Sequence, residues 1–243
     1  MSQAQKIYEG KAKILYTTED PDILLTVYKD DATAFNAQKR GQIQGKGEVN
    51  CQITAALYDW LDKKGIATHY IDCPEPNTML VKAVTIVPVE VVVRNIAAGS
   101  LCRQTGLTEG KVLDRPLVEY YYKSDELGDP LLTRDRISLL NLVSETRLAE
   151  IEKVAREINQ NLQSFFQECQ ITLVDFKLEF GIDRQNNLLL ADEISPDTCR
   201  LWDSQSEDPQ ARVMDKDRFR KDLGRVESAY QEVRQRILAN LKT

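Results

Sequence analysis

The sequence predicts an α+β fold in which mostly antiparallel sheets form two lobes with a cleft between them. Segments typical of strands follow one another through short turns more often than through helical crossovers. Three other segments carry apolar side chains every three or four residues, which is typical of amphipathic helices. The 243 residues contain no internal repeat or low-complexity segment, and this length suffices for one large domain or for two lobes that share a core.

The first lobe, residues 1–85, is predicted to be rich in strands. Its expected strands combine β-branched and aromatic residues between turn residues, and they cover residues 7–16, 23–29, 67–72 and 78–84. A helix is expected over residues 47–64, because apolar side chains recur there at helical spacing and Gly65 follows directly.

The second lobe, residues 86–243, is predicted to begin after a boundary that lies near residues 85–95. Its expected strands cover residues 88–95, 117–123, 171–180 and 187–193. Its expected helices, of which the first is short, cover residues 98–105, 146–169 and 216–241. The two long helices each have one apolar face, so each must pack against another element.

The composition excludes several classes of protein. Because 32 Lys and Arg residues stand against 38 Asp and Glu residues, the net charge of −6 argues against a nucleic-acid partner. The most apolar segment, residues 86–93, is interrupted by Pro88 and Glu90 and is too short to cross a membrane. No signal peptide is evident, and the five cysteines form no C-x-x-C pair. We therefore expect a cytoplasmic protein with reduced thiols and no membrane partner.

Charged and apolar side chains alternate in residues 173–180, LVDFKLEF. Strand geometry places Asp175, Lys177 and Glu179 on one face. If residues 187–193 form a hairpin with this strand, Asp192 lies close to the same face. Two carboxylates beside a lysine suit Mg²⁺, which binds one or two carboxylates together with phosphates and water. The solvated face of an antiparallel sheet explains the spacing at least as well.

Other strands also place charges on one face. In YEGKAK, Lys11 and Lys13 share one face, and Glu90 and Arg94 share a face of the strand 88–95. Lysines near the carboxylates would neutralise a polyphosphate, whereas Arg94 would suit a planar carboxylate or phosphate. Each strand alone is better explained by an exposed polar face.

Two further segments carry polar groups near the end of the chain. Ser195-Pro196-Asp197 is typical of a turn, and it brings a hydroxyl and a carboxylate close to Arg200. Lys216 and Arg220 lie one helical turn apart. A surface turn and a solvated helix face are the simpler explanations of these two segments.

Well-known catalytic motifs are absent. The segment from Gly41 to Gly47 lacks the spacing and the final Ser or Thr of a Walker A loop, and no G-x-G-x-x-G opens a helix. No kinase H-R-D or D-F-G motif and no G-x-S-x-G elbow is present. The single histidine, His69, makes a histidine triad or a multi-histidine metal site hard to build, and we expect it to have a structural role.

Three segments together resemble the SAICAR synthetase family. These are VPVEVVVRNIAAGSLCR at 87–103, LVDFKLEFG at 173–181 and EISPDTCRLWD at 193–203, and the resemblance extends from YEGKAK to DKDRFR. Members of the family join an aminoimidazole carboxylate ribonucleotide (CAIR) to L-aspartate, while ATP is converted to ADP and phosphate. The resemblance implies two α+β lobes with an ATP cleft between them, similar to ATP-grasp enzymes and kinases.

The resemblance also implies roles for individual residues. The residues expected to bind ATP are Lys11, Lys13, Lys82 and Lys177. The residues expected to hold Mg²⁺ are Glu179 and Asp192, and those expected to act in catalysis are Asp175 and Lys177. The residues expected to bind the substrate are Glu90, Arg94, Ser100, Lys123, Asp197, Arg200 and Arg220. Asn36 stands where some relatives carry Asp, so no role is assigned to it.

The implied reaction suits this set of residues. Phosphoryl transfer requires mainly positioning and charge neutralisation, which Lys, Arg and Mg²⁺ supply without a catalytic histidine. The expected partners are therefore CAIR, L-aspartate and ATP. A small-molecule kinase that uses the same cleft and a nucleotide-binding module without catalysis are the alternatives. The oligomeric state stays open, with a homodimer favoured.

Overall fold

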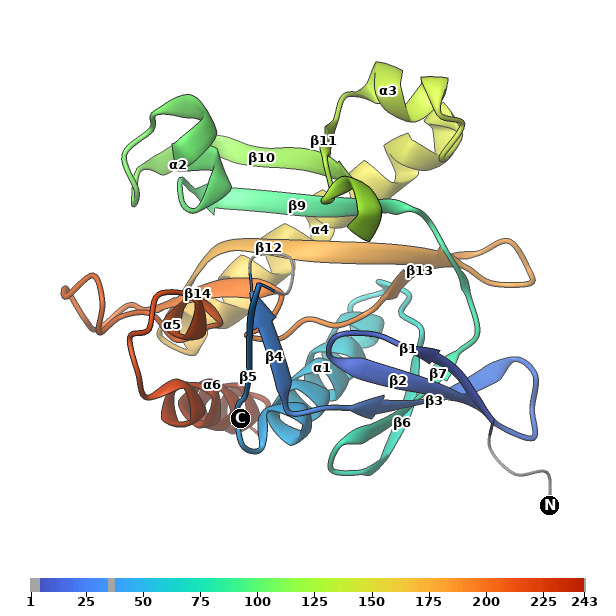
Figure 1. The fold of residues 1–243 in the computed structure, drawn as a ribbon, viewed down its shortest axis with the longest axis horizontal. Helices are drawn as coiled ribbons and strands as arrows, with labels where there is room; N and C mark the ends of the chain where they lie inside the picture. Colours follow the sequence, from blue (N-terminus) through green and yellow to red (C-terminus); the bar gives the residue numbers. More distant parts are fainter. Residues whose placement is uncertain (1–4, 35–37, 243) are drawn as a thin grey trace.

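The computed structural model describes residues 5–34 and 38–242, so Asn36 lies outside the described residues. Two antiparallel sheets lie on opposite sides of the molecule, with helices packed around them (Figure 1). The predicted α+β class with mostly antiparallel sheets is thereby confirmed. Within the described ranges, no helix is both long and apolar enough to span a bilayer.

The first sheet has five strands in the order β1-β2-β3-β7-β6. They are β1 (Lys6–Glu9), β2 (Lys13–Thr17), β3 (Ile23–Tyr28), β7 (Thr78–Lys82) and β6 (Tyr70–Glu75). The prediction of one strand over residues 7–16 is wrong, because the chain turns between β1 and β2 and the Gly10 N–H donates to the Lys13 carbonyl at 2.8 Å. Lys11 therefore lies in a turn and does not share a strand face with Lys13.

A two-stranded hairpin was not predicted. Its strands are β4 (Asp31–Ala34) and β5 (Lys39–Gln42). Each has only four residues, and neither shows a clear alternation of apolar and polar side chains. The hairpin is tied to the C-terminal part of the chain, because Lys39 Nζ donates to the Phe219 carbonyl at 2.6 Å.

The second sheet contains seven strands, with β9 between β10 and β12. They are β8 (Thr85–Ile86), β9 (Val89–Ile96), β10 (Val112–Tyr122), β11 (Leu131–Leu132), β12 (Ile171–Ile182), β13 (Leu188–Ala191) and β14 (Cys199–Asp203). β12 and β13 form the predicted hairpin, in which Glu179 pairs with Ala191. β14 was not predicted, because it begins shortly after Ser195-Pro196-Asp197, which is typical of a turn.

The helices that pack around the sheets are α1 (Lys46–Lys63), α2 (Ser100–Thr105), α3 (Arg134–Leu139), α4 (Glu145–Glu168), α5 (Asp217–Arg220) and α6 (Val226–Asn240), with a short 3₁₀ helix at Asp125–Leu127. The single helix predicted over residues 216–241 is wrong. Asp222, Gly224 and Arg225 have φ angles of 54°, 67° and 53°, so the backbone leaves the right-handed helical region between α5 and α6.

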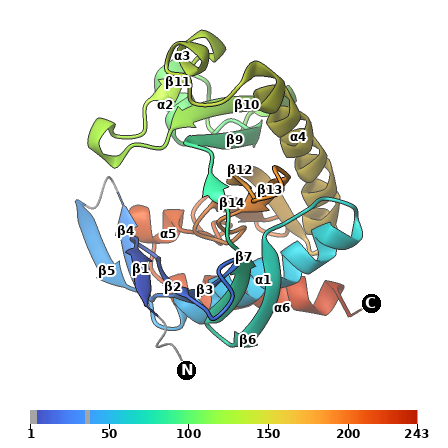
Figure 2. The same cartoon turned by 90° about the vertical axis from the view of Figure 1, so that its right-hand side faces the viewer.

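Two hydrophobic cores meet at α1, which lies between the first sheet and α6 (Figure 2). Cys51 and Ala55 pack into the smaller core beneath the first sheet. Ile53 and Leu57 pack into the main core, which also contains apolar side chains of α4, β9 and β12. Helix α1 therefore fixes the first sheet against the second.

Candidate active site

A cleft of about 1250 Å³ lies between the two sheets. Its lining includes all but one of the residues predicted to bind a ligand, hold a metal or act in catalysis. The predicted residues in the lining are Lys11, Lys13, Lys82, Glu90, Arg94, Lys123, Asp175, Lys177, Glu179, Asp192, Asp197, Arg200 and Arg220. Ser100 is outside the lining, and its hydroxyl accepts a hydrogen bond from Arg94 Nη2 at 2.9 Å.

Lys177 lies at the centre of a cluster of carboxylates. Its Nζ is 2.5 Å from Glu179, 3.2 Å from Glu90 and 3.2 Å from Asp192. The predicted face of β12 therefore points into the cleft rather than into open solvent. Lys123 adds a second cation, 2.8 Å from Glu179. These charges lie together because β9, β12 and β13 are neighbouring strands.

Lys13 approaches this cluster from the opposite sheet. Its Nζ forms an ion pair with Asp192 and lies 3.1 Å from Glu193. Burial opposes the charge on Lys13, but the two carboxylates outweigh burial and raise its pKa. Burial likewise opposes the charge on Asp192, whose pKa is nevertheless lowered by Lys13 and Lys177. Both groups are therefore charged at neutral pH.

Asp192 has an unusual backbone conformation. Its φ of 62° is rare for a residue other than glycine, and such strain often occurs at functional positions. The Tyr58 hydroxyl donates to the preceding carbonyl, that of Ala191, at 2.6 Å. The His69 ring packs edge-on against Tyr58. Burial lowers the pKa of His69 to about 3, so the ring is neutral.

Asp175 does not reach the carboxylate cluster around Lys177. It lies between two arginines, 2.8 Å from Arg94 and 2.8 Å from Arg200. Arg94 is 3% exposed, and its guanidinium also donates to Glu119 at 2.6 Å and to Tyr121 at 3.2 Å. Asp175 therefore holds two arginines in place, and its catalytic role stays a prediction.

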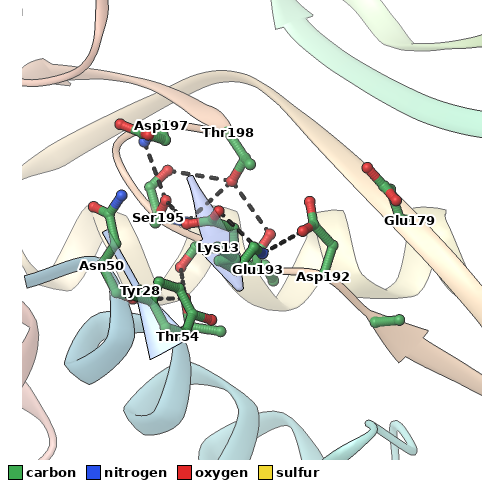
Figure 3. Close-up of polar contacts among 12 residues, drawn as sticks. Lys13, Tyr28, Asn50, Thr54, Glu179, Asp192, Glu193, Ser195, Asp197 and Thr198 are labelled. Carbon is green, nitrogen blue, oxygen red and sulfur yellow. Dashed lines mark hydrogen bonds and ion pairs between the residues drawn. The ribbon is translucent and has the colours of Figure 1, made fainter. Parts of the chain in front are cut away.

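The segment after β13 forms the other end of the cleft (Figure 3). The Asp197 carboxylate accepts from Lys46 Nζ at 2.9 Å and from the Tyr230 hydroxyl at 2.8 Å, and it lies 3.5 Å from Lys216 Nζ. Burial opposes the charge on Asp197, whereas Lys216 and Lys46 lower its pKa. Asp197 is therefore an anchor for cations rather than an exposed turn residue.

Sequence reasoning missed several polar residues of this site, namely Lys46, Glu119, Tyr121, Glu193 and Tyr230, and it explained Lys216 more simply as part of a solvated helix face. Lys46 is 1% exposed and is visible in the sequence only as part of a glycine-rich segment. Glu119 and Tyr121 alternate with Tyr120 along β10, so strand periodicity could have identified them once β10 was paired with β9. Nothing local in the sequence marks Tyr230.

Comparison with known proteins decides which family has this architecture and this cleft. The profile of SAICAR synthetase matches residues 6–237. The chain belongs to the SAICAR synthetase family. A relative from Synechocystis sp., named phosphoribosylaminoimidazole-succinocarboxamide synthase, is 68% identical over 98% of this chain and 90% of its own length.

Solved structures of SAICAR synthetases have the same fold. The phosphoribosylaminoimidazole-succinocarboxamide synthase of Ehrlichia chaffeensis matches with a TM-score of 0.93 at 43% identity, over 97% of this chain and 99% of its own. A SAICAR synthetase solved in complex with ADP matches with a TM-score of 0.91 at 43% identity, over 96% and 97%. The family expected from the three sequence segments is therefore confirmed.

Proposed function

We propose that this protein uses ATP to join the carboxylate of CAIR to the amine of L-aspartate, which yields SAICAR, ADP and phosphate. The observation that carries the proposal is the cleft of a SAICAR synthetase, in which lysines from both sheets surround buried carboxylates. Family membership favours this ligase over the alternative of a small-molecule kinase. The relative solved with ADP supports a nucleotide as one ligand.

ATP is proposed to lie along the first sheet. Lys11 and Lys13 would contact its phosphates, and Lys82 and the residues after it would border the adenine. Lys177 would reach a phosphate from the second sheet. This arrangement is supported by the position of all four lysines in the lining of one cleft.

Glu179 and Asp192 fit a Mg²⁺ ion that arrives with ATP. Glu179 is 4% exposed, the Asp192 side chain is 17% exposed, and both carboxylates contact Lys177. No set of three metal-binding side chains occurs in residues 5–34 and 38–242, so phosphate and water oxygens would complete the coordination. The ion would neutralise negative charge on the phosphates.

The ribonucleotide is proposed to bind at the Asp197 end of the cleft. Arg200 and Arg220 line this end, and both contact Asp217, at 3.1 Å and 2.6 Å. Arg94 and Ser100 would complete the site from β9 and α2, while Lys123 and Glu90 would border the reacting carboxylate. A carboxylate between two arginines keeps their planar guanidinium groups oriented for an anionic ligand.

The chemistry would proceed in two steps. The terminal phosphoryl group of ATP moves to a carboxylate oxygen of CAIR, which forms an acyl phosphate and releases ADP. The aspartate nitrogen then attacks the acyl carbon, the bond from that carbon to the phosphate oxygen breaks, and the nitrogen loses a proton. Lys177 and Lys13 would offset the charge that develops on the phosphoryl oxygens.

Three further properties are proposed for the working enzyme. It acts in the cytoplasm, which suits five cysteines that form no disulfide, among which Cys51, Cys169 and Cys199 are buried. It forms a homodimer. It consists of lobes 1–85 and 86–243, and this division is supported by β8, which lies at the boundary and pairs with β12 of the second sheet.

ADP release from Mg-ATP and CAIR, measured with and without L-aspartate, tests the proposal. Release that depends on aspartate, together with a succinyl amide detected by mass spectrometry, is the expected result. Release without aspartate, together with a stable phosphorylated product, would instead establish the kinase.

A further inference from the structure

Glu193 is a buried carboxylate to which sequence reasoning gave no role. It is 4% exposed and lies directly after the proposed metal ligand Asp192. Its Oε1 is 3.1 Å from Lys13 Nζ, and its Oε2 accepts a hydrogen bond from the Ser195 hydroxyl at 2.6 Å. Figure 3 shows Glu193 close to both Lys13 and Ser195. One side chain therefore joins a lysine of the first sheet to the segment that follows β13.

Ser195 connects Glu193 to Asp197 through hydrogen bonds. The Ser195 Oγ accepts a hydrogen bond from the Asp197 N–H at 3.1 Å, while its carbonyl accepts from the Thr198 and Cys199 N–H groups at 3.0 Å and 2.9 Å. The Ser195 hydroxyl is thus fixed on one side by Glu193 and on the other by the turn. A displacement of Glu193 would shift Asp197, which holds Lys46 and Lys216.

The charge of Glu193 links the two ends of the cleft energetically. A buried carboxylate that loses its cation is strongly destabilised, so Glu193 favours the arrangement in which Lys13 remains beside it. A ligand that orders the turn at Asp197 also orders Glu193. It thereby holds Lys13 where the phosphates of a nucleotide are proposed to bind.

We infer that Glu193 is a positioning residue that couples nucleotide binding at Lys13 to ribonucleotide binding at the 195–198 turn, an inference that rests on the proposed function. Coupling between two sites is reciprocal, so each ligand tightens the other by the same factor. Glu193 acts through Lys13 and Ser195, and its negative charge and its acceptor oxygen are both needed for this link.

The test measures the dissociation constant of Mg-ADP by calorimetry, with and without saturating CAIR. In the wild type we expect CAIR to tighten Mg-ADP at least about fivefold, the lower range of typical coupling. Glu193→Gln keeps the acceptor for Ser195 but removes the charge that holds Lys13, and Ser195→Ala removes the hydroxyl. In both variants CAIR should tighten Mg-ADP by less than about twofold, while each ligand still binds.

Glu152→Gln is the matched control. Glu152 also holds a hydroxyl, that of Tyr120 at 2.8 Å, and it forms ion pairs with Arg156 at 2.7 Å and with Arg134, but it is not part of the cleft lining. It should keep the wild-type ratio. The inference is overturned if Glu193→Gln, or Ser195→Ala where the first variant does not fold, keeps the wild-type ratio of the Mg-ADP dissociation constants without and with CAIR. It is also overturned if this ratio is near one in the wild type. If CAIR does not bind the wild type at all, the proposed function itself is wrong and the inference is overturned with it.

Discussion

Replacing Gly99 by alanine should move Arg200 away from its partners. Gly99 precedes α2 with a φ of 56° and a ψ of −124°, which is a conformation that side chains disfavour. A Cβ at this position would lie 2.7 Å from Arg200 Cζ. The guanidinium cannot yield freely, because it is held by Asp175 at 2.8 Å and by Asp217 at 3.1 Å.

The magnitude follows from these contacts. Backbone strain of about 1–3 kcal/mol should lower the melting temperature of Gly99→Ala by roughly 2–12 °C. Loss of the proposed charged hydrogen bond from Arg200 to the ribonucleotide, worth about 1.5–3 kcal/mol, should raise the KM for CAIR by about 10- to 150-fold. Thermal unfolding and initial rates of ADP release measure the two effects.

Gly106→Ala is the control at the opposite end of α2. Gly106 has a φ of 74°, but nothing lies within 4 Å of an added Cβ. This variant should lose about 1 kcal/mol of stability from the backbone alone, with an unchanged KM for CAIR. Equal effects of the two substitutions on the KM would refute the reasoning, since only Gly99 contacts Arg200.

Three other substitutions or conditions test the site. Lys177→Met should lower turnover about 10²–10³-fold while the protein stays folded, because it removes the cation shared by three carboxylates; near-normal ADP release would remove Lys177 from the catalytic residues. Tyr58→Phe should raise the Mg²⁺ concentration needed for half-maximal turnover several-fold, since it frees the carbonyl before Asp192; an unchanged Mg²⁺ requirement would contradict this. The pKa of Asp217, which burial would raise, is lowered to about 2, chiefly by Arg200 and Arg220. Because the folded pKa lies below the unfolded value, about 2 kcal/mol of stability is present above pH ~4 and is lost as the pH falls toward 2; Asp217→Asn should flatten this part of the stability profile in denaturant unfolding.

The sequence predicted the parts of the site that follow strand periodicity. Alternation along β12 identified Asp175, Lys177 and Glu179 as one face, and the following strand brought Asp192 to it. The same reasoning failed at Lys11, because a glycine turn inside an apparently continuous strand leaves the apolar pattern unchanged. The two halves of the C-terminal helix were merged for a similar reason, since Leu223 continues the apolar spacing through the break.

The residues that sequence reasoning missed depend on contacts between distant segments. Lys46 and Asp197 are separated by 151 positions, and their ion pair exists only because α1 packs beside the segment after β13. Tyr230 reaches Asp197 from α6, again through tertiary packing. No periodicity within either segment encodes such a pairing. The resemblance to a family identified Asp197 and Arg200, but it did not identify Lys46 and Tyr230, which hold Asp197.

The position of α1 between two cores has a consequence for folding. Cys51 and Ala55 are covered by the first sheet, while Ile53 and Leu57 are covered by the main core. A fragment of residues 1–85 would therefore expose half of this helix to water. We expect the two lobes to unfold in one cooperative transition, with amide hydrogens of α1 exchanging as slowly as those of β12. The two lobes thus line different sides of the cleft, but we expect them to unfold as one unit.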